Sequence, residues 1–159
     1  MMKTLIDQYA AYDLWANTRI VERIQREKEN VPDIHVKSSF PSLRLTLDHI
    51  RDSGNVWYQR IFGLPALSVG GHIDSVLKVS VALRDQVQAT DEEALLGLVS
   101  YARAGGQQHR QPRWQLLMHC YNHASYHRGQ VITIMRQLDL EEIPGTDLVA
   151  YQRLLAGNK

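Results

Sequence analysis

Cysteine is almost absent from this chain, since Cys120 is the only one among 159 residues. A single cysteine excludes an internal disulfide, and it excludes metal motifs that need a pair of cysteines. Long apolar runs are also missing, because no stretch reaches the roughly 18 residues of a membrane span. Residues 1–17 are interrupted by Asp7 and Asp13 and lack the apolar run of a signal peptide. We therefore expect a cytoplasmic protein in a reducing compartment, with no membrane partner.

An excess of charge of one sign is missing too. The chain has eighteen basic and seventeen acidic residues, which leaves a formal net charge of +1. This balance gives no electrostatic reason to expect a nucleic-acid partner or an anionic membrane surface. The one local basic cluster, residues 103–113, is interpreted as a solvated loop. Hydrophobic residues make up 44% and charged residues 22%, which is typical of a globular protein, and the length predicts a single domain over residues 1–159.

Several motifs that carry chemistry do not occur. The sequence has no Glu-x-x-His pair, which argues against a di-iron carboxylate bundle, and no His-Glu-x-x-His zinc-protease motif. The pairs Gly70-Gly71 and Gly105-Gly106 lack the Lys-Ser/Thr that follows in a phosphate-binding loop. Cys120 lies in mid-helix on an apolar face, so it is interpreted as an inert buried thiol rather than a nucleophile.

Helical periodicity is present almost throughout. Apolar residues recur at three- and four-residue steps, which is typical of amphipathic helices. The expected long helices cover residues 4–28, 41–62, about 75–87 and about 113–138, with short helices after residue 90 and over residues 148–155. The expected caps are Ser39 for the second helix, Asp74 or Ser75 for the third, Thr90 for the first short helix and Asp147 for the last.

The connections between these helices are long. Residues 29–41 and 101–112 are polar and lack a helical period, so they are interpreted as a crossing loop and an irregular connector. Simple up-down-up-down bundles use short loops instead. The sequence therefore predicts an all-α fold, a four-helix bundle with long crossover connections.

Three of the seven histidines, His119, His123 and His127, follow one another at four-residue steps in the late helix. Each residue of a helix turns by about 100°, so their directions can be compared with the apolar face around Cys120 and Val131. His127 lies within about 30° of the centre of that face, His123 within about 70°, and His119 at about 110°. His123 and His127 are therefore expected to face the interior, and His119 its margin.

Two inward imidazoles at positions i and i+4 can hold a metal ion from one helix. The alternative is that each is a core histidine hydrogen-bonded to a neighbour. A third ligand would favour the metal site, and four other histidines are available. His49 is the only one of them inside an expected helix, on the flank of its apolar stripe; His35, His72 and His109 fall in loops or at helix edges.

The string His119-x-x-Asn122-His123-x-x-x-His127-Arg-Gly-Gln130 resembles the signature of the DinB family, within the DinB/YfiT-like superfamily of bacterial metal-binding bundles. Other pieces resemble the family in the same order. These are residues 12–17 (YDLWAN), residues 47–50 (LDHI) with Trp57, and a tail from Leu138 to Tyr151. The resemblance spans nearly the whole chain.

The resemblance implies a four-helix bundle with long crossover connections, often a homodimer. It also implies one divalent metal ion per chain, zinc or nickel, held by His49, His123 and His127. Three imidazoles with an open position are typical of a catalytic zinc site rather than a closed structural one. His119, Asn122 and Arg128 lie near these ligands in the sequence, and we assign no chemical step to them.

For function, the resemblance implies a divalent-metal-binding protein and, among superfamily members, a metal-dependent S-transferase that uses a low-molecular-weight thiol. Two alternatives stay open. One is a non-catalytic, stress-related bundle that the metal stabilises and that binds a ligand or partner. The other is a metal-dependent hydrolase.

Overall fold

The computed structural model describes residues 1–103 and 105–157, and it confirms the all-α class. Six helices and one short 3₁₀ turn account for most of the chain, with one small hairpin of two strands. The elements are α1 (Met2–Ile24), η1 (Val31–Asp33), α2 (Leu43–Phe62), α3 (Ser75–Ala89), α4 (Glu92–Leu96), β1 (Leu98–Ala102), β2 (Gln108–Pro112), α5 (Arg113–Gln137) and α6 (Leu148–Leu155).

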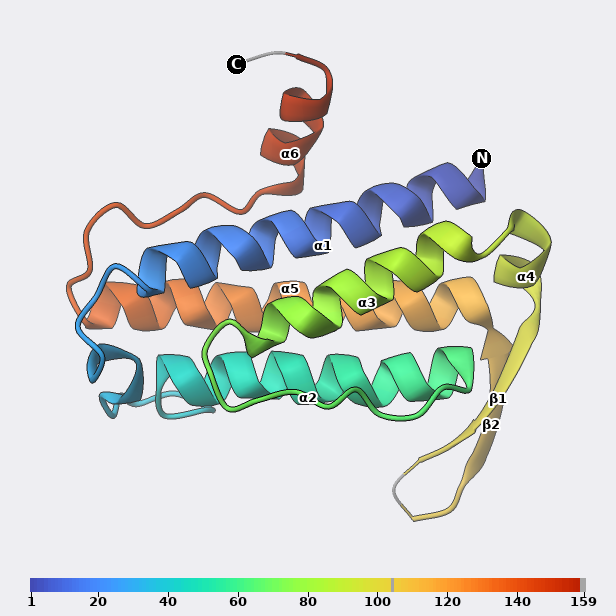
Figure 1. The fold of residues 1–159 in the computed structure, drawn as a ribbon, viewed down its shortest axis with the longest axis horizontal. Helices are drawn as coiled ribbons and strands as arrows, with labels where there is room; N and C mark the ends of the chain where they lie inside the picture. Colours follow the sequence, from blue (N-terminus) through green and yellow to red (C-terminus); the bar gives the residue numbers. More distant parts are fainter. Residues whose placement is uncertain (104, 158–159) are drawn as a thin grey trace.

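The four long helices lie alongside one another (Figure 1). Both α2 and α1 pack against α3 and α5. As Figure 1 shows, α1 and α5 run in one direction, whereas α2 and α3 run in the opposite one. Residues 63–74 must therefore return along the length of α2 before α3 begins, and α4 with the hairpin links α3 to α5 at the other end of the molecule. Two consecutive parallel helices need such a return segment, which explains why the connections are long.

Aliphatic side chains fill the space between the helices in two main groups. One group surrounds Leu47, Val131 and Ile134, and the other surrounds Ile6, Ile61 and Leu117. Burial of each such side chain stabilises the fold by about 1.5–3 kcal/mol. Leu43, Leu47, Ile50 and Ile61 of α2 are all buried. His49 and His127 lie among residues of the first group, His49 between Leu47 and Ile50 and His127 between Ala124 and Val131.

Two predicted caps are wrong by a few residues. Ser42, not Ser39, caps α2: its side chain accepts a hydrogen bond of 3.1 Å from the amide of Leu45. Asp91, not Thr90, caps α4, and its carboxylate accepts a hydrogen bond of 2.7 Å from the amide of Ala94. In both cases the capping side chain is the polar residue directly before the first helical residue, where its oxygen can reach the third amide of the turn.

The other two caps stand partly as predicted. Asp74 and Asp147 occupy the N-cap positions of α3 and α6, but neither side chain forms a capping hydrogen bond. A carboxylate at this position still carries charge of the sign that the helix N-terminus favours.

The connector expected over residues 101–112 is in fact part of an antiparallel hairpin. β1 and β2 pair in a register that runs from Leu98 opposite Pro112 to Ala102 opposite Gln108. Each strand has only five residues, which is too short for alternation to stand out in the sequence. Gly105 and Gly106, with φ of 103° and 82°, provide the left-handed backbone of the turn, and Ala104 lies outside the described residues.

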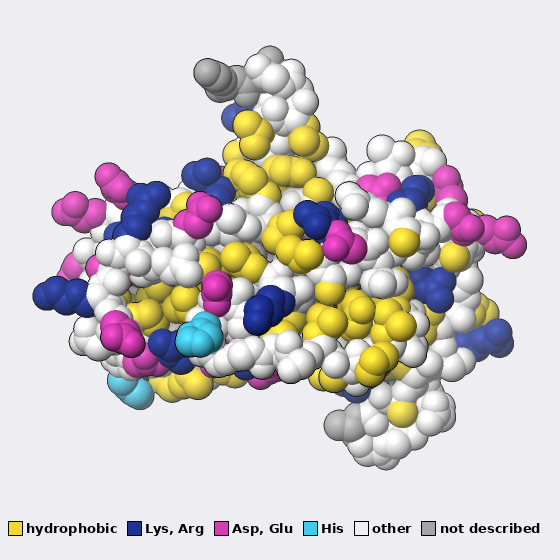
Figure 2. All heavy atoms as spheres, in the orientation of Figure 1, with side chains coloured by type: hydrophobic (Ala, Val, Ile, Leu, Met, Phe, Trp, Pro, Cys, Tyr) yellow, Lys and Arg dark blue, Asp and Glu magenta, His cyan; other side chains and the backbone are white. Residues whose placement is uncertain are grey.

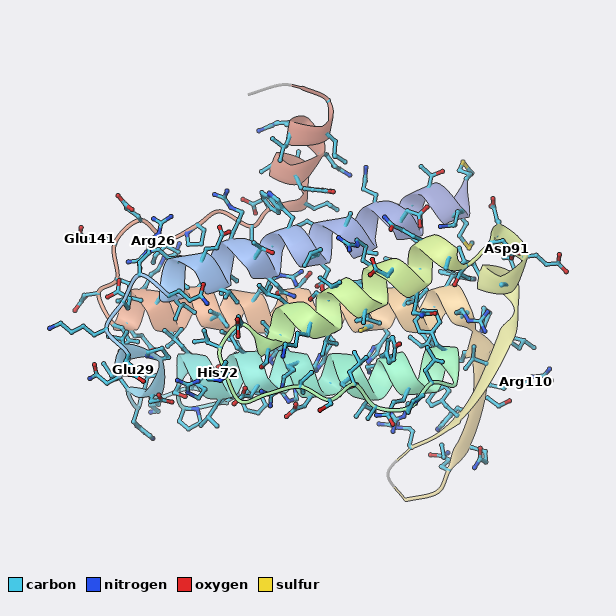
Figure 3. The ribbon with its side chains drawn as sticks, viewed as in Figure 1. Arg26, Glu29, His72, Asp91, Arg110 and Glu141 are labelled. Atoms are coloured by element: carbon cyan, nitrogen blue, oxygen red, sulfur yellow. The ribbon has the colours of Figure 1, made fainter. Side chains whose placement is uncertain are left out.

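The basic cluster at residues 103–113 is not entirely a solvated loop either. Arg110 on β2 is exposed, and it points away from the helices in Figure 3. Arg113, at the start of α5, is half-buried and donates hydrogen bonds to the backbone carbonyls of Ile61 and Ala94. This arginine therefore ties the start of α5 to the end of α2 and to α4. Among the described residues, no helix is long and apolar enough to cross a membrane.

Candidate metal centre

α2 and α5 lie side by side and bring three histidines together at mid-length. His49 of α2 and His123 of α5 place their Nε2 atoms 3.3 Å apart. The Nε2 atom of His127, one turn further along α5, lies 3.1 Å from that of His123. One nitrogen from each of the three rings lies within 4.8 Å of the other two. The i and i+4 spacing on α5 and the contact between the two helices together produce this convergence.

The spacing of these nitrogens fits a metal ion. With metal–nitrogen bonds of about 2.0–2.1 Å, two imidazole nitrogens on one tetrahedral ion lie about 3.3 Å apart, and on an octahedral ion about 3.0 Å apart. The two Nε2 separations of 3.1 and 3.3 Å fall in this range. A neutral imidazole has one N–H and one lone pair, so three Nε2 atoms facing one another cannot satisfy each other fully. The three histidines therefore form a cluster that could hold an ion between them.

Hydrogen bonding and ring packing fix the orientation of His127. Its Nδ1 lies 2.7 Å from the side-chain oxygen of Gln130. The amide oxygen can only accept, so Nδ1 carries the proton and Nε2 is left with its lone pair toward the cluster. The amide nitrogen of Gln130 in turn donates to the hydroxyl of Ser39 at 3.4 Å. Such an outer contact sets the tautomer that a metal ligand needs.

Phe40 covers the cluster from the loop before α2. Its ring stacks on His49 with 4.2 Å between centroids and 22° between planes, and it meets His127 edge-on at 5.6 Å. Phe40 and Gln130 were missed as site residues from the sequence. The signal for Gln130 was its place in the His-Arg-Gly-Gln string, three residues after His127 and so on the same side of the helix.

The electrostatics of the cluster favour neutral rings. Burial, together with the neighbouring rings of His127, His49 and His119, lowers the pKa of His123 to about 4. Burial and the nearby His127 also lower the pKa of His49, against a smaller opposing effect of Asp52. Both rings are therefore neutral at pH 7 and offer lone pairs rather than protons, which is the state in which imidazole binds a metal.

His119 lies outside the cluster, as its helical angle predicts. Its ring packs edge-on against Trp57 with 4.9 Å between centroids and lies 6.1 Å from the ring of His123. The other candidate third ligands lie elsewhere. His35 follows η1, His109 is on β2, and His72 is exposed in the turn before α3, where Figure 3 labels it. Asn122 is exposed on α5.

Arg128 follows His127 directly but points to a different side of α5, toward α1. It is 1% exposed, and it forms an ion pair with Asp13 of α1, which is 4% exposed. The same guanidinium donates to the side-chain oxygens of Asn17 at 3.1 Å and Ser125 at 2.8 Å. Its central carbon also lies 5.3 Å from the centre of the Tyr12 ring.

The buried pair continues into α3. The amide of Asn17 donates to the hydroxyl of Ser80 at 2.8 Å, and this hydroxyl donates to Asp13 at 3.1 Å. Three helices are thus joined by one polar network. The sequence signal for it was the spacing of Asp13 and Asn17, four residues apart on the buried face of the first helix, but their partner on α5 could not be named from spacing.

Comparison with known proteins supports the relationship that the motifs imply. The model of the DinB family matches residues 1–155. Protein DinB from Bacillus subtilis (strain 168) is 24% identical over 161 residues, which cover 88% of this chain and 89% of that protein. The matched region contains both the histidine cluster and the Asp13–Arg128 pair.

Proposed function

This chain belongs to the DinB family, and we propose that it binds one divalent metal ion through His49, His123 and His127. The observation that carries the proposal is the meeting of three Nε2 atoms from two helices at 3.1 and 3.3 Å. The long helices serve as a four-helix scaffold that sets this spacing. Imidazole ligands suit zinc and nickel alike, so we propose one of these two ions.

We further propose a metal-dependent S-transferase that uses a low-molecular-weight thiol. A divalent ion held by neutral ligands would supply positive charge that favours the thiolate form of a thiol, which is otherwise mostly protonated at pH 7. In the transfer, the thiol sulfur forms a bond to an electrophilic carbon, the leaving group departs with its electron pair, and the thiol proton passes to solvent.

The residues of this chain contribute orientation. Gln130 holds His127 in one tautomer, and Phe40 covers one side of His49 and His127 with an apolar ring. Three protein ligands leave at least one position of a four-coordinate ion for a substrate. Holding a thiol and an electrophile next to each other lowers the barrier further, because their orientation is fixed before reaction.

A non-catalytic binding protein is the second candidate, and one observation favours it. Among the described residues, the side-chain hydrogen bonds of the three histidines are with one another and with Gln130. No carboxylate is therefore hydrogen-bonded to the cluster as a general base. In that case the ion would serve to stabilise the fold or to bind a ligand without turnover.

Two measurements test the proposal. Metal analysis of protein purified without added metal should find about one zinc or nickel ion per chain. Conjugation of glutathione, bacillithiol, mycothiol or coenzyme A to a model electrophile should be faster with metal-loaded protein than with its His127→Ala variant. Equal rates with every thiol would reject the transferase and leave the binding protein.

We also propose a homodimer. α6 stands away from the four long helices, and hydrophobic side chains gather at its base in Figure 2. Val149, Leu154 and Leu155 on this helix are each more than half exposed. A second copy that covered them would remove apolar surface from water. Sedimentation at micromolar concentration tests the claim, and a monomer would reject it.

A further inference from the structure

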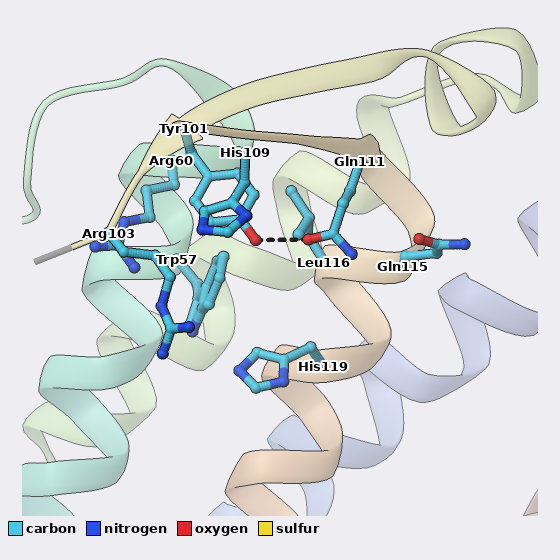
Figure 4. A pocket seen from close by; sticks show the side chains of 9 residues that line it. All are labelled: Trp57, Arg60, Tyr101, Arg103, His109, Gln111, Gln115, Leu116 and His119. Carbon is cyan, nitrogen blue, oxygen red and sulfur yellow. Dashed lines mark hydrogen bonds between the residues drawn. The ribbon is translucent and has the colours of Figure 1, made fainter. Parts of the chain in front are cut away.

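A cavity of about 460 Å³ lies between the hairpin, α2 and the start of α5 (Figure 4). Its lining includes Trp57 and Arg60 from α2, Tyr101 and His109 from the hairpin, and His119 from α5. The volume suits a small molecule. None of these residues belongs to the histidine cluster, so the cavity is a separate feature of the fold.

Aromatic rings form one wall of this cavity. Trp57 and Tyr101 meet edge-to-face with 5.4 Å between centroids, and His119 packs against Trp57 at 4.9 Å. Tyr101 is held in place by a stacked His109 at 5.5 Å and by a hydrogen bond from its hydroxyl to Gln111 at 2.5 Å. This wall is aromatic, and it can take the apolar part of a ligand.

The charge of the cavity has one sign. Two arginines, Arg60 and Arg103, line it, and none of its described lining residues is acidic. Neither arginine forms a salt bridge with another described residue, whereas several surface arginines elsewhere in the chain do. The guanidinium of Arg60 lies 5.1 Å from the centre of the Trp57 ring, which holds it at the wall. In a chain with net charge +1, this is a local concentration of positive charge without a partner.

An unsatisfied polar atom points to a ligand as well. Nε2 of His109, on the lining of the cavity, is buried and has no hydrogen-bond partner among the described residues. Buried polar atoms in proteins are nearly always paired, so an unpaired one beside a cavity is unusual and is consistent with a polar ligand nearby.

The cavity also adjoins the proposed metal centre. His119 lines the cavity, and its ring lies 6.1 Å from the ring of His123. A ligand in the cavity would therefore be separated from the histidine cluster by about one side chain. The arginines lie at the hairpin side of the same space, as Figure 4 shows.

We infer that this cavity binds a small anionic molecule whose carboxylate or phosphate group pairs with Arg60 and Arg103 and whose remainder lies against Trp57. Guanidinium groups match both oxyanions, and charge-assisted hydrogen bonds of this kind are the strong ones. The proposal of an anion site depends only on the observations made of the cavity. Its assignment as the place where an anionic thiol cosubstrate is held, with its sulfur toward the histidines, rests on the proposed function.

The probe that tests the site is S-methylglutathione, which has two carboxylates but no free thiol. Titration calorimetry with the metal-free protein should show binding that Arg60→Gln and Arg103→Gln each weaken about tenfold or more, as the loss of a charge-assisted hydrogen bond requires. The matched control is Arg110→Gln, which removes the same charge from the same hairpin without lining the cavity. It should change the dissociation constant less than about twofold.

A second arm uses inorganic phosphate and distinguishes the two anions. Binding of phosphate but not S-methylglutathione, with the same dependence on Arg60 and Arg103, assigns the site to phosphate-bearing molecules. Binding of neither probe overturns the inference, and so does an equal loss in Arg110→Gln. Thermal melts of each variant check that it is folded.

His127→Ala separates this inference from the proposed function. Retained S-methylglutathione binding in this variant, without thiol transfer by any metal-loaded protein, would reject the transferase and keep the anion site. Transfer that is unaffected by Arg60→Gln and Arg103→Gln would keep the transferase and reject the cavity as the place where its thiol is held.

Discussion

Two neighbouring residues of α5, His127 and Arg128, belong to two regions that differ in the partners that the fold provides for them. His127 faces α2, where the Nε2 atoms of three imidazoles meet. Arg128 faces α1, where the Asp13 carboxylate and the Asn17 side-chain oxygen accept from its guanidinium, and Ser125 of α5 accepts from it as well. The histidines of the first region form no ion pair with a described residue, whereas in the second region Asp13 provides the counter-charge of Arg128. A site that could hold a metal ion and a site that joins helices thus lie on two different sides of one helix.

This contrast predicts which region stabilises the chain without a ligand. A buried ion pair costs little while both partners are present, but removal of one leaves a charge buried without compensation. The histidine cluster contains no ion pair of this kind. Substitutions on the Arg128 side should therefore affect folding, and those on the His127 side should affect binding.

The largest effect is expected for Arg128→Met. Asp13, 4% exposed, would lose its counter-charge, and the free energy of unfolding should fall by about 3–5 kcal/mol. Urea unfolding of metal-free protein measures it. Arg136→Met, at an exposed arginine of the same helix, is the control and should cost no more than about 0.5 kcal/mol.

The double variant Asp13→Asn with Arg128→Met sharpens this test. With both charges removed, the loss should be well below the sum of the single losses, since no charge is left buried. Additive losses, or a loss below about 1 kcal/mol for Arg128→Met, would show that the pair does not hold the helices as argued.

The next effect is the response to metal. At a free metal concentration a hundredfold above the dissociation constant, bound metal should stabilise the protein by about 2.7 kcal/mol, and chelation should remove this gain. His127→Ala should bind no metal and gain nothing from it, because it loses the most buried ligand of the three. His119→Ala should still bind about one ion per chain. Equal loss in both variants would contradict the separation of His119 from the cluster.

A smaller change is expected for Gln130→Ala. Without the hydrogen bond to Nδ1, His127 can adopt the other tautomer and rotate, so metal affinity should fall about 10–100-fold while one ion is still bound. Competition with a chromophoric chelator gives the affinity. Gln137→Ala, exposed near the end of α5, is the matched control and should leave it unchanged.

The contrast between the two regions also marks what a sequence can predict. Periodicity on one helix separated His123 and His127 from His119, because each step of four residues turns the direction by about 40° and leaves His119 furthest from the centre of the apolar face. The choice of His49 came from its place inside a helix and from the resemblance, since no spacing reveals that α2 contacts α5 at that level. The partner of Arg128 lies 115 positions away, on α1, and was not predicted.

The hairpin was missed for a different reason. Its strands have five residues each, and the pairing of β1 with β2 stabilises them together with the packing of Val99 and Tyr101 on the helices. Such short strands depend on tertiary contacts rather than on local propensity. The hairpin provides one wall of the cavity beside His119, so this error also concealed the cavity from the sequence.

The smallest effect is expected for His127→Ala on the reactivity of Cys120, whose thiol is buried beside the Arg128 region. Burial raises the pKa of this thiol far above its usual range, so a disulfide reagent at pH 8 should react with it only when the fold opens. His127→Ala should change the labelling rate less than about twofold, since it leaves the buried pair intact. Arg128→Met should raise the rate at least about 100-fold, because the destabilisation of about 3–5 kcal/mol expected for this variant increases the open population by at least that factor. Fast labelling of Cys120 in His127→Ala, with a slow rate retained in Arg128→Met, would reverse the roles that we assign to the two sides of α5.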